Sequence, residues 1–298
     1  MKLVLFGSGG QVGRALKPRL EQLGAVAAFD RTTADFERPQ SLVEIIDRER
    51  PDVIVNAAAY TAVDAAEDDR VRADLVNAEA VRQIAEAARR HNALVVHYST
   101  DFVFDGRADH PYRETDATNP LSAYGASKLG GDEALMRSGA DHLIFRVTWN
   151  YSPEGKNFPL AILRLAKARE AIDVVSDEIG AATSADLIAD ATVNALRQTL
   201  ADRSKAGLYH LTASGSASRD ELARFVVTEA RAAGAELVLK PENIKPILAR
   251  DYAAAKAARP SNSRLDTSKF QAAFGMALPS WQDGIRNLIT TLRQGGSL

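Results

Sequence analysis

The residues best suited to chemistry in this chain are a tyrosine and a lysine four positions apart, Tyr124 and Lys128. On a helix, positions i and i+4 lie on one face, so both polar heads can reach one ligand. A tyrosine is a poor acid–base group at neutral pH because its ordinary pKa is roughly 10. A cation beside it favours the phenolate and brings the pKa closer to the working range. The pair predicts acid–base chemistry, and a solvated lysine beside a half-buried tyrosine is the alternative.

We expect a hydroxyl group beside this pair, from Thr100. This threonine follows the apolar run 94–98, which is typical of a strand. In open α/β sheets ligands lie beyond the carboxyl ends of the strands, so Thr100 could hydrogen-bond a substrate oxygen. A strand-end cap is the alternative role. With Tyr124 and Lys128 it would complete a set of hydroxyl, phenol and ammonium groups able to stabilise an oxyanion.

The chain opens with a glycine-rich loop, in which Gly7, Gly10 and Gly13 follow a short apolar run and precede a helical pattern. Glycine permits the tight turn and removes the Cβ that would block a pyrophosphate. The first helical turn, with Gln11 and Val12, offers free N–H groups and the positive end of the helix dipole. The loop predicts dinucleotide binding, and a purely structural turn is the alternative.

The end of the second apolar run carries residues expected near the adenosine ribose. Asp30 could hydrogen-bond that ribose, whereas Arg31 could meet a 2′-phosphate, so the two indicate opposite cofactor preferences. Asp35 and Phe36 could bracket the adenine, or be a solvated carboxylate and a core ring. Segment 57–61 follows the next run, and its small residues would let the backbone approach a ligand closely, unless they only pack a strand end.

The first half of the chain alternates short apolar runs with helical patterns, which predicts right-handed crossovers and a doubly wound parallel sheet. Pro18 lies inside the first helical pattern and should kink it or disturb its hydrogen bonds. The expected strands are 3–6, 25–29, 53–55, 94–98 and 143–147, and the expected helices are a first helix ending at Leu20, then 41–49, 71–90 and 122–138.

The second half is less regular, and we expect a Rossmann-like domain followed by a smaller α/β substrate-binding region. The boundaries predicted are 1–150 for the dinucleotide-binding domain, with a later contribution from about 183–212, and 151–298 for the mainly substrate-binding region. Segment 240–264 is rich in Pro, Ala and Ser and should loop over a surface or cleft. The elements expected here are helices 158–169, 185–199, 219–233 and 281–293 and a strand at 208–211.

Bulk properties narrow the class of protein. The 298 residues include 37 basic and 39 acidic side chains without long runs of either sign, which argues against nucleic acid or an anionic membrane as the main partner. No apolar run is long enough to span a bilayer. The chain has no cysteine and no signal-like start, which fits a cytoplasmic enzyme. Its five histidines lack ligand-like spacing, so no metal site is expected.

Together these segments resemble the extended short-chain dehydrogenase/reductases, and within them the branch that acts on dTDP-linked 4-keto-6-deoxy sugars. The resemblance runs nearly end to end, in the same order and at similar spacing. The run Ser-Thr-Asp-Phe-Val-Phe-Asp-Gly at 99–106 is specific to this branch. The glycine loop and Tyr-x-x-x-Lys are shared by the whole superfamily. The segments that carry the resemblance are 5–13, 51–64, 96–106, 114–116, 120–130, 145–149 and 259–266.

The resemblance implies an oxidoreductase that uses NADPH or NADH and takes a dTDP-sugar. Hydride would pass to C4 of dTDP-6-deoxy-L-lyxo-4-hexulose and give dTDP-L-rhamnose, the last step of dTDP-rhamnose biosynthesis. Tyr124 would protonate the forming alkoxide, and Lys128 would bind the nicotinamide ribose and lower the tyrosine pKa. Thr100 would hydrogen-bond the C4 oxygen, while Asp101 and Trp149 would contact the sugar. The predicted cofactor-binding residues are Gly7, Gly10, Gln11, Val12, Gly13, Asp30, Arg31, Asp35, Phe36, Ala57, Ala58, Ala59, Tyr60, Thr61, Tyr98, Tyr124 and Lys128.

The chain departs from the family pattern at several positions. Glu178 and Ala182 stand where Gln and Pro are usual, which changes the expected loop shape and not the chemistry. Some members form a dimer bridged by a metal through glutamates, and one of those positions is Ala15 here. Asp186 matches another acidic position, but a single carboxylate would hold Mg²⁺ poorly. We therefore expect no metal, and a monomer or a homodimer not bridged by metal.

Two other functions remain open from the sequence. A nucleotide-sugar epimerase or dehydratase with tightly held NAD would share the fold. A dehydratase would normally carry acidic residues directly beside Thr100, and here Asp101 is followed by Phe102, which disfavours a dehydratase and leaves an epimerase open. Relatives of these enzymes also serve as regulatory subunits that bind a dinucleotide without turnover, although the full set of catalytic residues favours an enzyme.

Overall fold

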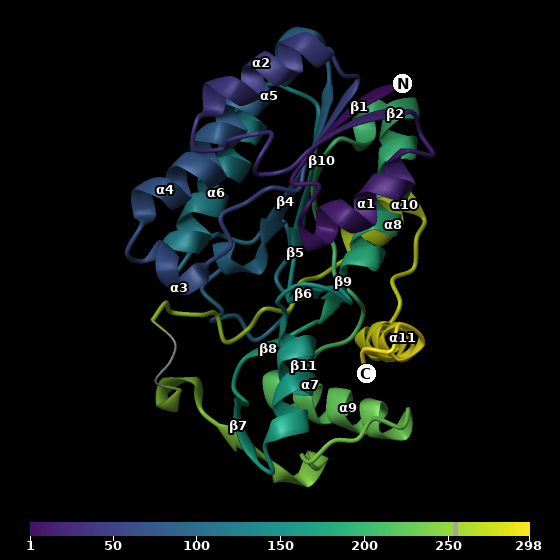
Figure 1. Ribbon diagram of the computed structural model, residues 1–298. Coiled ribbons are helices and arrows are strands. Elements are labelled where there is room, and N and C mark those ends of the chain that lie inside the picture. Colours follow the sequence, from purple (N-terminus) through teal and green to yellow (C-terminus); the bar gives the residue numbers. More distant parts are fainter. Residues whose placement is uncertain (253–255) are drawn as a thin grey trace.

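A six-stranded parallel sheet forms the centre of the fold, in the order β10–β5–β4–β3–β1–β2 (Figure 1). It is seen in a computed structural model that describes residues 1–252 and 256–298. Strands β3 and β4 are buried along their whole length, as apolar parallel strands covered on both faces must be. The strands are β1 (Lys2–Phe6), β2 (Ala25–Phe29), β3 (Val53–Asn56), β4 (Leu94–Thr100), β5 (His142–Val147) and β10 (Gly207–His210).

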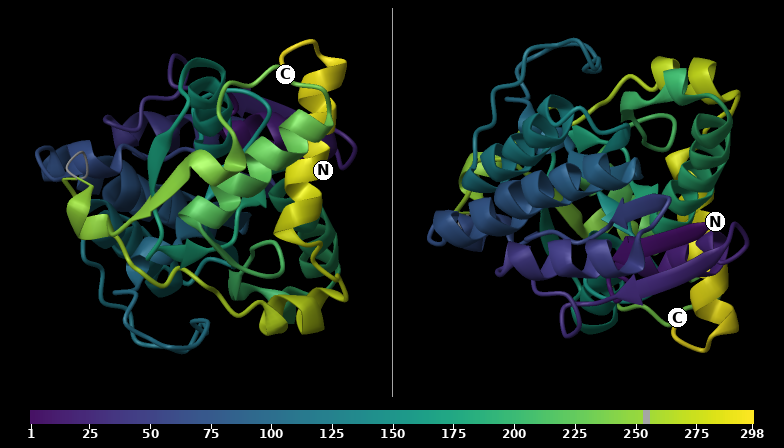
Figure 2. Two further views of the ribbon diagram at one scale, coloured as in Figure 1. Left: turned by 90° about the horizontal axis from the view of Figure 1, so that it is seen from below. Right: turned by 90° about the horizontal axis from the view of Figure 1, so that it is seen from above.

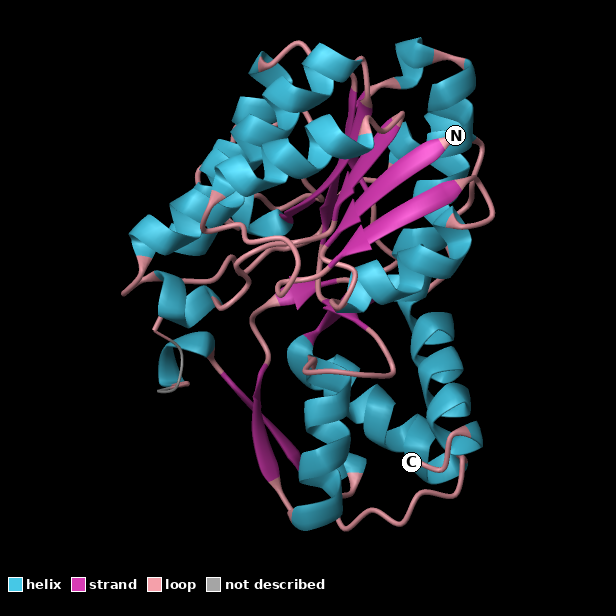
Figure 3. Cartoon of the chain, turned by 45° about the horizontal axis from the view of Figure 1, so that its top comes forward, coloured by secondary structure: helices cyan, strands magenta, loops and turns pink. Residues whose placement is uncertain are grey.

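Helices cover both faces of the sheet, which confirms the predicted doubly wound α/β fold (Figures 1 and 3). Alternate residues of β1 enter two different cores: Leu3 and Leu5 join one cluster, and Val4 and Phe6 join the other. One face carries α2 (Pro39–Glu49), α5 (Ala80–His91) and α6 (Ala123–Arg137), and the other carries α1 (Gln11–Leu20), α8 (Ala185–Ala201) and α10 (Ser268–Phe274).

One helical prediction needs correction in detail, and the effect expected of Pro18 stays a prediction. The helix expected over 71–90 is interrupted by a five-residue π-helical turn, Leu75–Glu79, between α4 (Arg70–Asp74) and α5. This turn packs on α6, where a side chain at Gly131 would overlap the Asn77 carbonyl. Pro18 lies inside α1, which continues through it and ends two residues later, at Leu20.

The second half of the chain builds a smaller lobe beside the carboxyl ends of the strands (Figures 1 and 2). Segment 240–264 was expected to be a loop throughout, but it contains β12 (Ile244–Ile247), which pairs with β7; residues 253–255 lie outside the described residues. The lobe contains α7 (Phe158–Ala168), α9 (Arg219–Ala232), α11 (Trp281–Gln294), β7 (Ile172–Val175), β8 (Ile179–Gly180) and β11 (Ala217–Ser218), and smaller elements nearby are α3 (Val63–Ala66), β6 (Asn150–Tyr151) and β9 (Thr183–Ser184).

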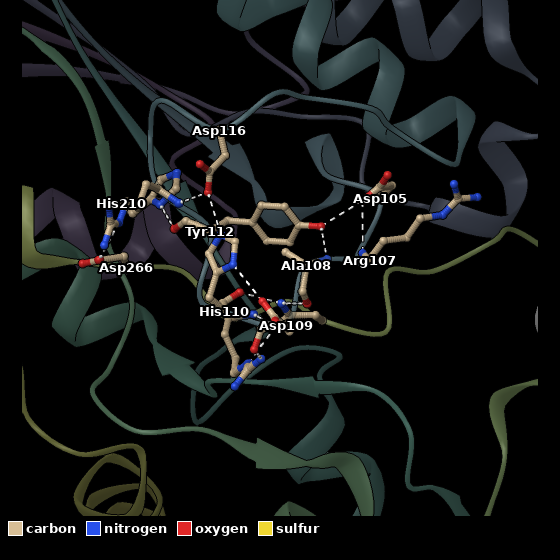
Figure 4. Close-up of polar contacts among 12 residues, drawn as sticks. Asp105, Arg107, Ala108, Asp109, His110, Tyr112, Asp116, His210 and Asp266 are labelled. Atoms are coloured by element: carbon tan, nitrogen blue, oxygen red, sulfur yellow. Dashed lines mark hydrogen bonds and ion pairs between the residues drawn. The ribbon is translucent and has the colours of Figure 1, made fainter.

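A loop after β4 joins the sheet to the C-terminal part of the chain. Tyr112 donates its backbone N–H to Arg264 O at 2.8 Å, and its carbonyl accepts the Asp266 N–H at 2.7 Å. The Tyr112 hydroxyl donates to Asp105 at 2.8 Å, and the ring lies between the two ends of this polar cluster (Figure 4). These bonds hold the segment after Thr100 against the lobe that faces it. Within the described residues, no helix has the length and apolar character needed to cross a membrane.

Candidate active site

The end of β4 and the start of α6 bring Thr100 and Tyr124 together. Ser122 caps α6 by accepting the Gly125 N–H at 3.1 Å. Gly125 is required for the close approach, because a Cβ there would overlap the Phe102 carbonyl in the turn that follows Thr100. The rings of Phe102 and Tyr124 then meet edge to face, with centroids 5.6 Å apart. The Thr100 hydroxyl, at the end of β4, lies near enough to the Tyr124 phenol to act on its pKa.

The Tyr124 phenol is held in its protonated form. Burial raises its pKa above the ordinary value, and the effect of the nearby Thr100 hydroxyl only partly offsets this. Lys128 is not among the groups that lower this pKa, because its head is directed at the Tyr98 carbonyl, and the role expected for it stays a prediction. A neutral phenol is nevertheless the form that can donate a proton.

Lys128 lies inside the protein and is only 1% exposed. Its Nζ donates to the Tyr98 carbonyl at 2.7 Å and lies 3.2 Å from His97 Nε2. Burial lowers the pKa of Lys128 to about 8, although the Asp132 carboxylate acts in the opposite direction. The lysine is therefore close to its tyrosine in sequence, but its head faces strand β4.

A buried polar network surrounds Lys128, and reading the sequence missed it. Asn56 and His97 are neighbours in the register of β3 and β4, and both are buried. Ser99 lies on the same face of β4 as His97 and donates to Asp132 Oδ2 at 2.7 Å. Arg146 on β5 approaches that oxygen at 3.4 Å. The signal available was the alternation of polar residues at 97 and 99 inside an otherwise apolar strand.

A second missed residue, Asn77, fixes the segment after β3. Its amide oxygen accepts the Tyr60 N–H at 2.9 Å, and its amide nitrogen donates to the Tyr60 carbonyl at 3.0 Å and to Ser127 Oγ at 2.9 Å. Asn77 lies in the π-helical turn, which adds one residue to that turn and aims the side chain at the strand end. Residues 57–60 are partly exposed there, beside α6.

The Trp149 ring packs on residues of the smaller lobe, and its backbone has an uncommon conformation. Its φ is +41°, in the left-handed region. The ring packs on Gly180, where a Cβ would lie 2.7 Å from Trp149 Cε2. The Arg219 guanidinium stacks on the ring at 3.7 Å from its centroid and approaches Glu178 at 3.3 Å. The departure from the family pattern at Glu178 thus has a partner, Arg219, at the N-terminus of α9.

Asp101 is buried between these groups and is 3% exposed. Its Oδ1 accepts from Thr100 Oγ1 at 3.1 Å, and within the described residues its Oδ2 has no hydrogen-bond partner. Burial raises the pKa of Asp101 to about 6, against the effects of the Ser263 and Thr100 hydroxyls and the charge of Arg219. A buried carboxyl oxygen without a partner, next to Thr100, is available to a polar ligand.

The glycine loop has the close packing expected of a dinucleotide fold. Gly7 has φ +78°, and a Cβ there would lie 2.6 Å from the backbone of Ala57 and Ala58, so this loop packs directly on the end of β3. A Cβ at Gly13 would overlap the Gly7 carbonyl. Helix α1 starts at Gln11, and among the residues that the structure describes no side chain caps its first N–H groups.

Other predicted cofactor residues lie after the end of β2 and at the start of α1. Asp30 is at the surface, where its carboxylate accepts from the Thr32 backbone at 2.9 Å, and Arg31 is exposed beside it. Asp35 is bound to Arg38 at 2.9 Å. Gln11 accepts from Ser152 Oγ at 3.0 Å and from Asn157 Nδ2 at 2.9 Å, which ties the loop to the second half of the chain.

Two predicted cofactor contacts fall in the core. The Phe36 ring is buried and meets Phe6 edge to face at 5.7 Å, which is the alternative role considered for it. The Tyr98 ring faces the α8 side of the sheet, and its hydroxyl bonds to Thr192 at 2.8 Å. Because side chains alternate along a strand, Tyr98 offers the Lys128 side of the sheet only its carbonyl. Neither ring reaches the polar cluster at the strand ends.

Comparisons with known proteins agree with this arrangement. Residues 1–294 match the family model described as RmlD substrate binding domain. The chain is 47% identical over 296 residues to dTDP-4-dehydrorhamnose reductase of Escherichia coli K12, covering 98% of each, and 45% identical over 286 residues to that of Burkholderia thailandensis, covering 95% and 96%.

A solved structure extends the likeness to three dimensions. The dTDP-4-dehydrorhamnose reductase of Bacillus anthracis, in complex with NADP, superposes with a TM-score of 0.88 at 29% identity, covering 97% of this chain and 99% of that one. The agreement therefore includes both the sheet and the smaller lobe. By its family model, its relatives and its fold, this chain belongs to the dTDP-4-dehydrorhamnose reductase family of the extended short-chain dehydrogenase/reductases.

Proposed function

We propose that this chain reduces the C4 keto group of dTDP-6-deoxy-L-lyxo-4-hexulose to dTDP-L-rhamnose, with NADPH or NADH as the reductant. The observation that carries the proposal is the placement of the Thr100 hydroxyl and the Tyr124 phenol together at the carboxyl end of β4. This pair lies in a chain that is 47% identical to an Escherichia coli dTDP-4-dehydrorhamnose reductase along almost its whole length. Two hydroxyl donors at a strand end can receive a carbonyl oxygen.

The chemistry follows from what these groups can do. The bound cofactor would supply a hydride to the carbonyl carbon, and negative charge would develop on the oxygen. Thr100 would donate a hydrogen bond to that oxygen, and Tyr124 would transfer its proton to it. The buried phenol suits this role because its pKa is raised, which keeps the proton on Tyr124 until the alkoxide forms.

The glycine loop and the start of α1 are proposed as the pyrophosphate site. Gly7 and Gly13 bring this backbone close to the end of β3, and the first turn at Gln11 and Val12 has no side-chain cap. Residues 57–61 and Asp30 and Arg31 would contact the two ribose halves. The relative from Bacillus anthracis is in complex with NADP, which supports a nicotinamide dinucleotide as the ligand.

The sugar is proposed to lie between the strand ends and the smaller lobe. Trp149 would pack on the sugar ring, and the unpartnered oxygen of Asp101 would bind one of its hydroxyl groups. Residues 1–150 with about 183–212 would then form the dinucleotide-binding domain, because β10 joins the sheet and α8 packs on α1. Residues 151–298 would contribute mainly to the substrate site.

A coupled assay tests the proposal. The keto sugar is made in place by the upstream dehydratase and epimerase, the purified chain and NADPH are added, and the sugar product is identified. The expected result is equal loss of NADPH and formation of dTDP-L-rhamnose. Cofactor binding without turnover would favour a regulatory subunit. Interconversion of nucleotide sugars without net loss of NADPH would favour an epimerase.

A further inference from the structure

The hydrogen bonds around His97 determine where its proton lies. Asn56 Oδ1 accepts the Ala58 backbone N–H at 3.1 Å, so the amide group has one possible orientation and its nitrogen points at the imidazole. Asn56 Nδ2 then donates to His97 Nδ1 across 3.2 Å. His97 Nδ1 is therefore an acceptor, and a neutral imidazole with an unprotonated Nδ1 carries its proton on Nε2.

This tautomer is directed at a lysine. His97 Nε2 lies 3.2 Å from Lys128 Nζ, so the N–H on the imidazole faces the amino group. An ammonium has only donors and could not accept that hydrogen, whereas a neutral amine has one lone pair that can. A neutral Lys128 would satisfy both of its neighbours, donating to the Tyr98 carbonyl at 2.7 Å and accepting from His97.

We propose that His97, oriented by Asn56, is a positioning residue that holds Lys128 as a neutral amine by donating its Nε2–H to the lysine nitrogen. The inference deepens the proposed function, on which it rests, because Lys128 belongs to the catalytic set of that reaction. It attributes the neutral state of Lys128 to a specific hydrogen bond from His97 on β4, in addition to the general effect of burial.

The charged groups nearby affect the balance between the ammonium and the neutral amine forms of Lys128. Asp132, on the same helix as Lys128, favours the ammonium, but Ser99 and Arg146 on β4 and β5 already bind its other oxygen. His142 on β5 acts on His97 and not on the lysine directly. Burial lowers the pKa of Lys128, and burial is also the largest cause that lowers the pKa of His97 and so keeps the imidazole neutral.

The proton on His97 Nε2 has a second possible acceptor besides Lys128. Asp132 Oδ1 lies 3.9 Å from His97 Nε2, and within the described residues it has no hydrogen-bond partner. If Lys128 turns toward a ribose hydroxyl as an ammonium, His97 can donate to this oxygen with a small ring movement. Binding of the dinucleotide would then be accompanied by uptake of a proton on Lys128.

The tautomer is measured directly on the unmodified protein by nitrogen-15 NMR of labelled histidine. The expected spectrum has His97 protonated on Nε2 and unprotonated on Nδ1 between pH 8 and 9, where Lys128 is mainly neutral, and His97→Asn identifies its signals. A proton on Nδ1, or an imidazolium, would overturn the inference, because Nε2 could not then donate to a neutral amine.

The lysine is followed by the pH dependence of its labelled Cε carbon, with Lys128→Arg to assign the signal. In the wild type we expect a pKa near 8, as burial and His97 predict. In His97→Gln the amide can turn its oxygen to the ammonium, and we expect an upward shift of about one pKa unit. The exposed His91, changed to Gln, is the matched control and should leave the value unchanged.

Calorimetry of NADPH binding in two buffers of different ionisation enthalpy completes the test. At pH 8.5 the wild type should take up a fraction of one proton, and His97→Gln should take up less. A Lys128 pKa above 10 in the wild type, or the same Lys128 pKa in His97→Gln as in the wild type, would overturn the inference. The proposed reductase activity would still stand. An inactive chain with the expected titrations would instead reject the activity alone.

Discussion

The packing of Trp149 on Gly180 gives a sharp prediction for the substrate side of the site. In Gly180→Ala the new Cβ would lie 2.7 Å from Trp149 Cε2 and 2.9 Å from Cζ2. Ordinary carbon contacts are about 3.5–4.0 Å, so the indole ring must retreat by about 1 Å. The backbone cannot yield easily, because Gly180 pairs with Ala217 in β8–β11.

The size of the effect follows from this displacement. A misplacement of about 1 Å at a substrate-positioning group can reduce activity about 10²-fold. Overpacking of a fitted contact also destabilises a protein by about 1–3 kcal/mol. We therefore expect Gly180→Ala to lower kcat/KM for the keto sugar by about 100-fold and to reduce the free energy of unfolding by about 1–3 kcal/mol.

The assay combines steady-state oxidation of NADPH, at varied keto-sugar concentration, with unfolding in urea. Gly295→Ala is the control, because its Cβ would meet only ordinary contacts, the nearest at 3.4 Å, and the residue follows the last turn of α11. A kcat/KM within threefold of the wild type, together with unchanged stability, would refute the argument that Gly180 sets the position of the indole ring.

Three further outcomes are expected. Tyr124→Phe should bind NADPH normally but lose about 10²–10⁴-fold in turnover, since the proton donor is removed; near-normal turnover would eliminate this tyrosine as the acid. The pKa of Asp101 in the folded protein, about 6, lies above its value in the unfolded chain. The contribution of Asp101 to the free energy of unfolding is therefore fully present below about pH 4 and is lost as the pH rises to about 6. Asp101→Asn should therefore gain up to about 3 kcal/mol relative to wild type between pH 4 and 7 in urea titrations, and a pH-independent difference would show that the carboxyl is not desolvated. Because the Asp30 carboxylate is engaged by its own turn while Arg31 is exposed, NADPH and NADH should differ in kcat/KM by less than a hundredfold, and a larger ratio would show that one side chain dominates.

The sheet could be predicted from the sequence because its strands are short apolar runs between amphipathic helices. Buried parallel strands such as β3 and β4 must be apolar on both sides, and this leaves a clear signal. Thr100 and Tyr124 were predicted as partners for the same reason: one ends a strand, and the other begins the helix that returns to it.

The parts that could not be predicted depend on contacts between distant elements. The π-helical turn at Leu75–Glu79 has the same apolar pattern as a regular helix, and only its packing on Gly131 distinguishes it. Strand β12 was missed because Pro246 and the polar residues around it resemble a loop, whereas pairing with β7 determines its conformation.

Side-chain direction was the other source of error. Tyr98 lies one residue from His97, and the strand sends their side chains to opposite faces, so the ring enters the core while the imidazole meets Lys128. Spacing alone could not reveal that Arg219 compensates Glu178, since 41 residues separate them and only the smaller lobe joins them.

The most direct test of the central claim follows the hydride itself. NADPH carrying deuterium at the transferable position of the nicotinamide is supplied with the keto sugar, and the product is examined by mass spectrometry and proton NMR. The account predicts dTDP-L-rhamnose with one deuterium, bonded to C4 of the sugar. Product without deuterium at C4, or oxidised cofactor with no reduced sugar, would contradict it.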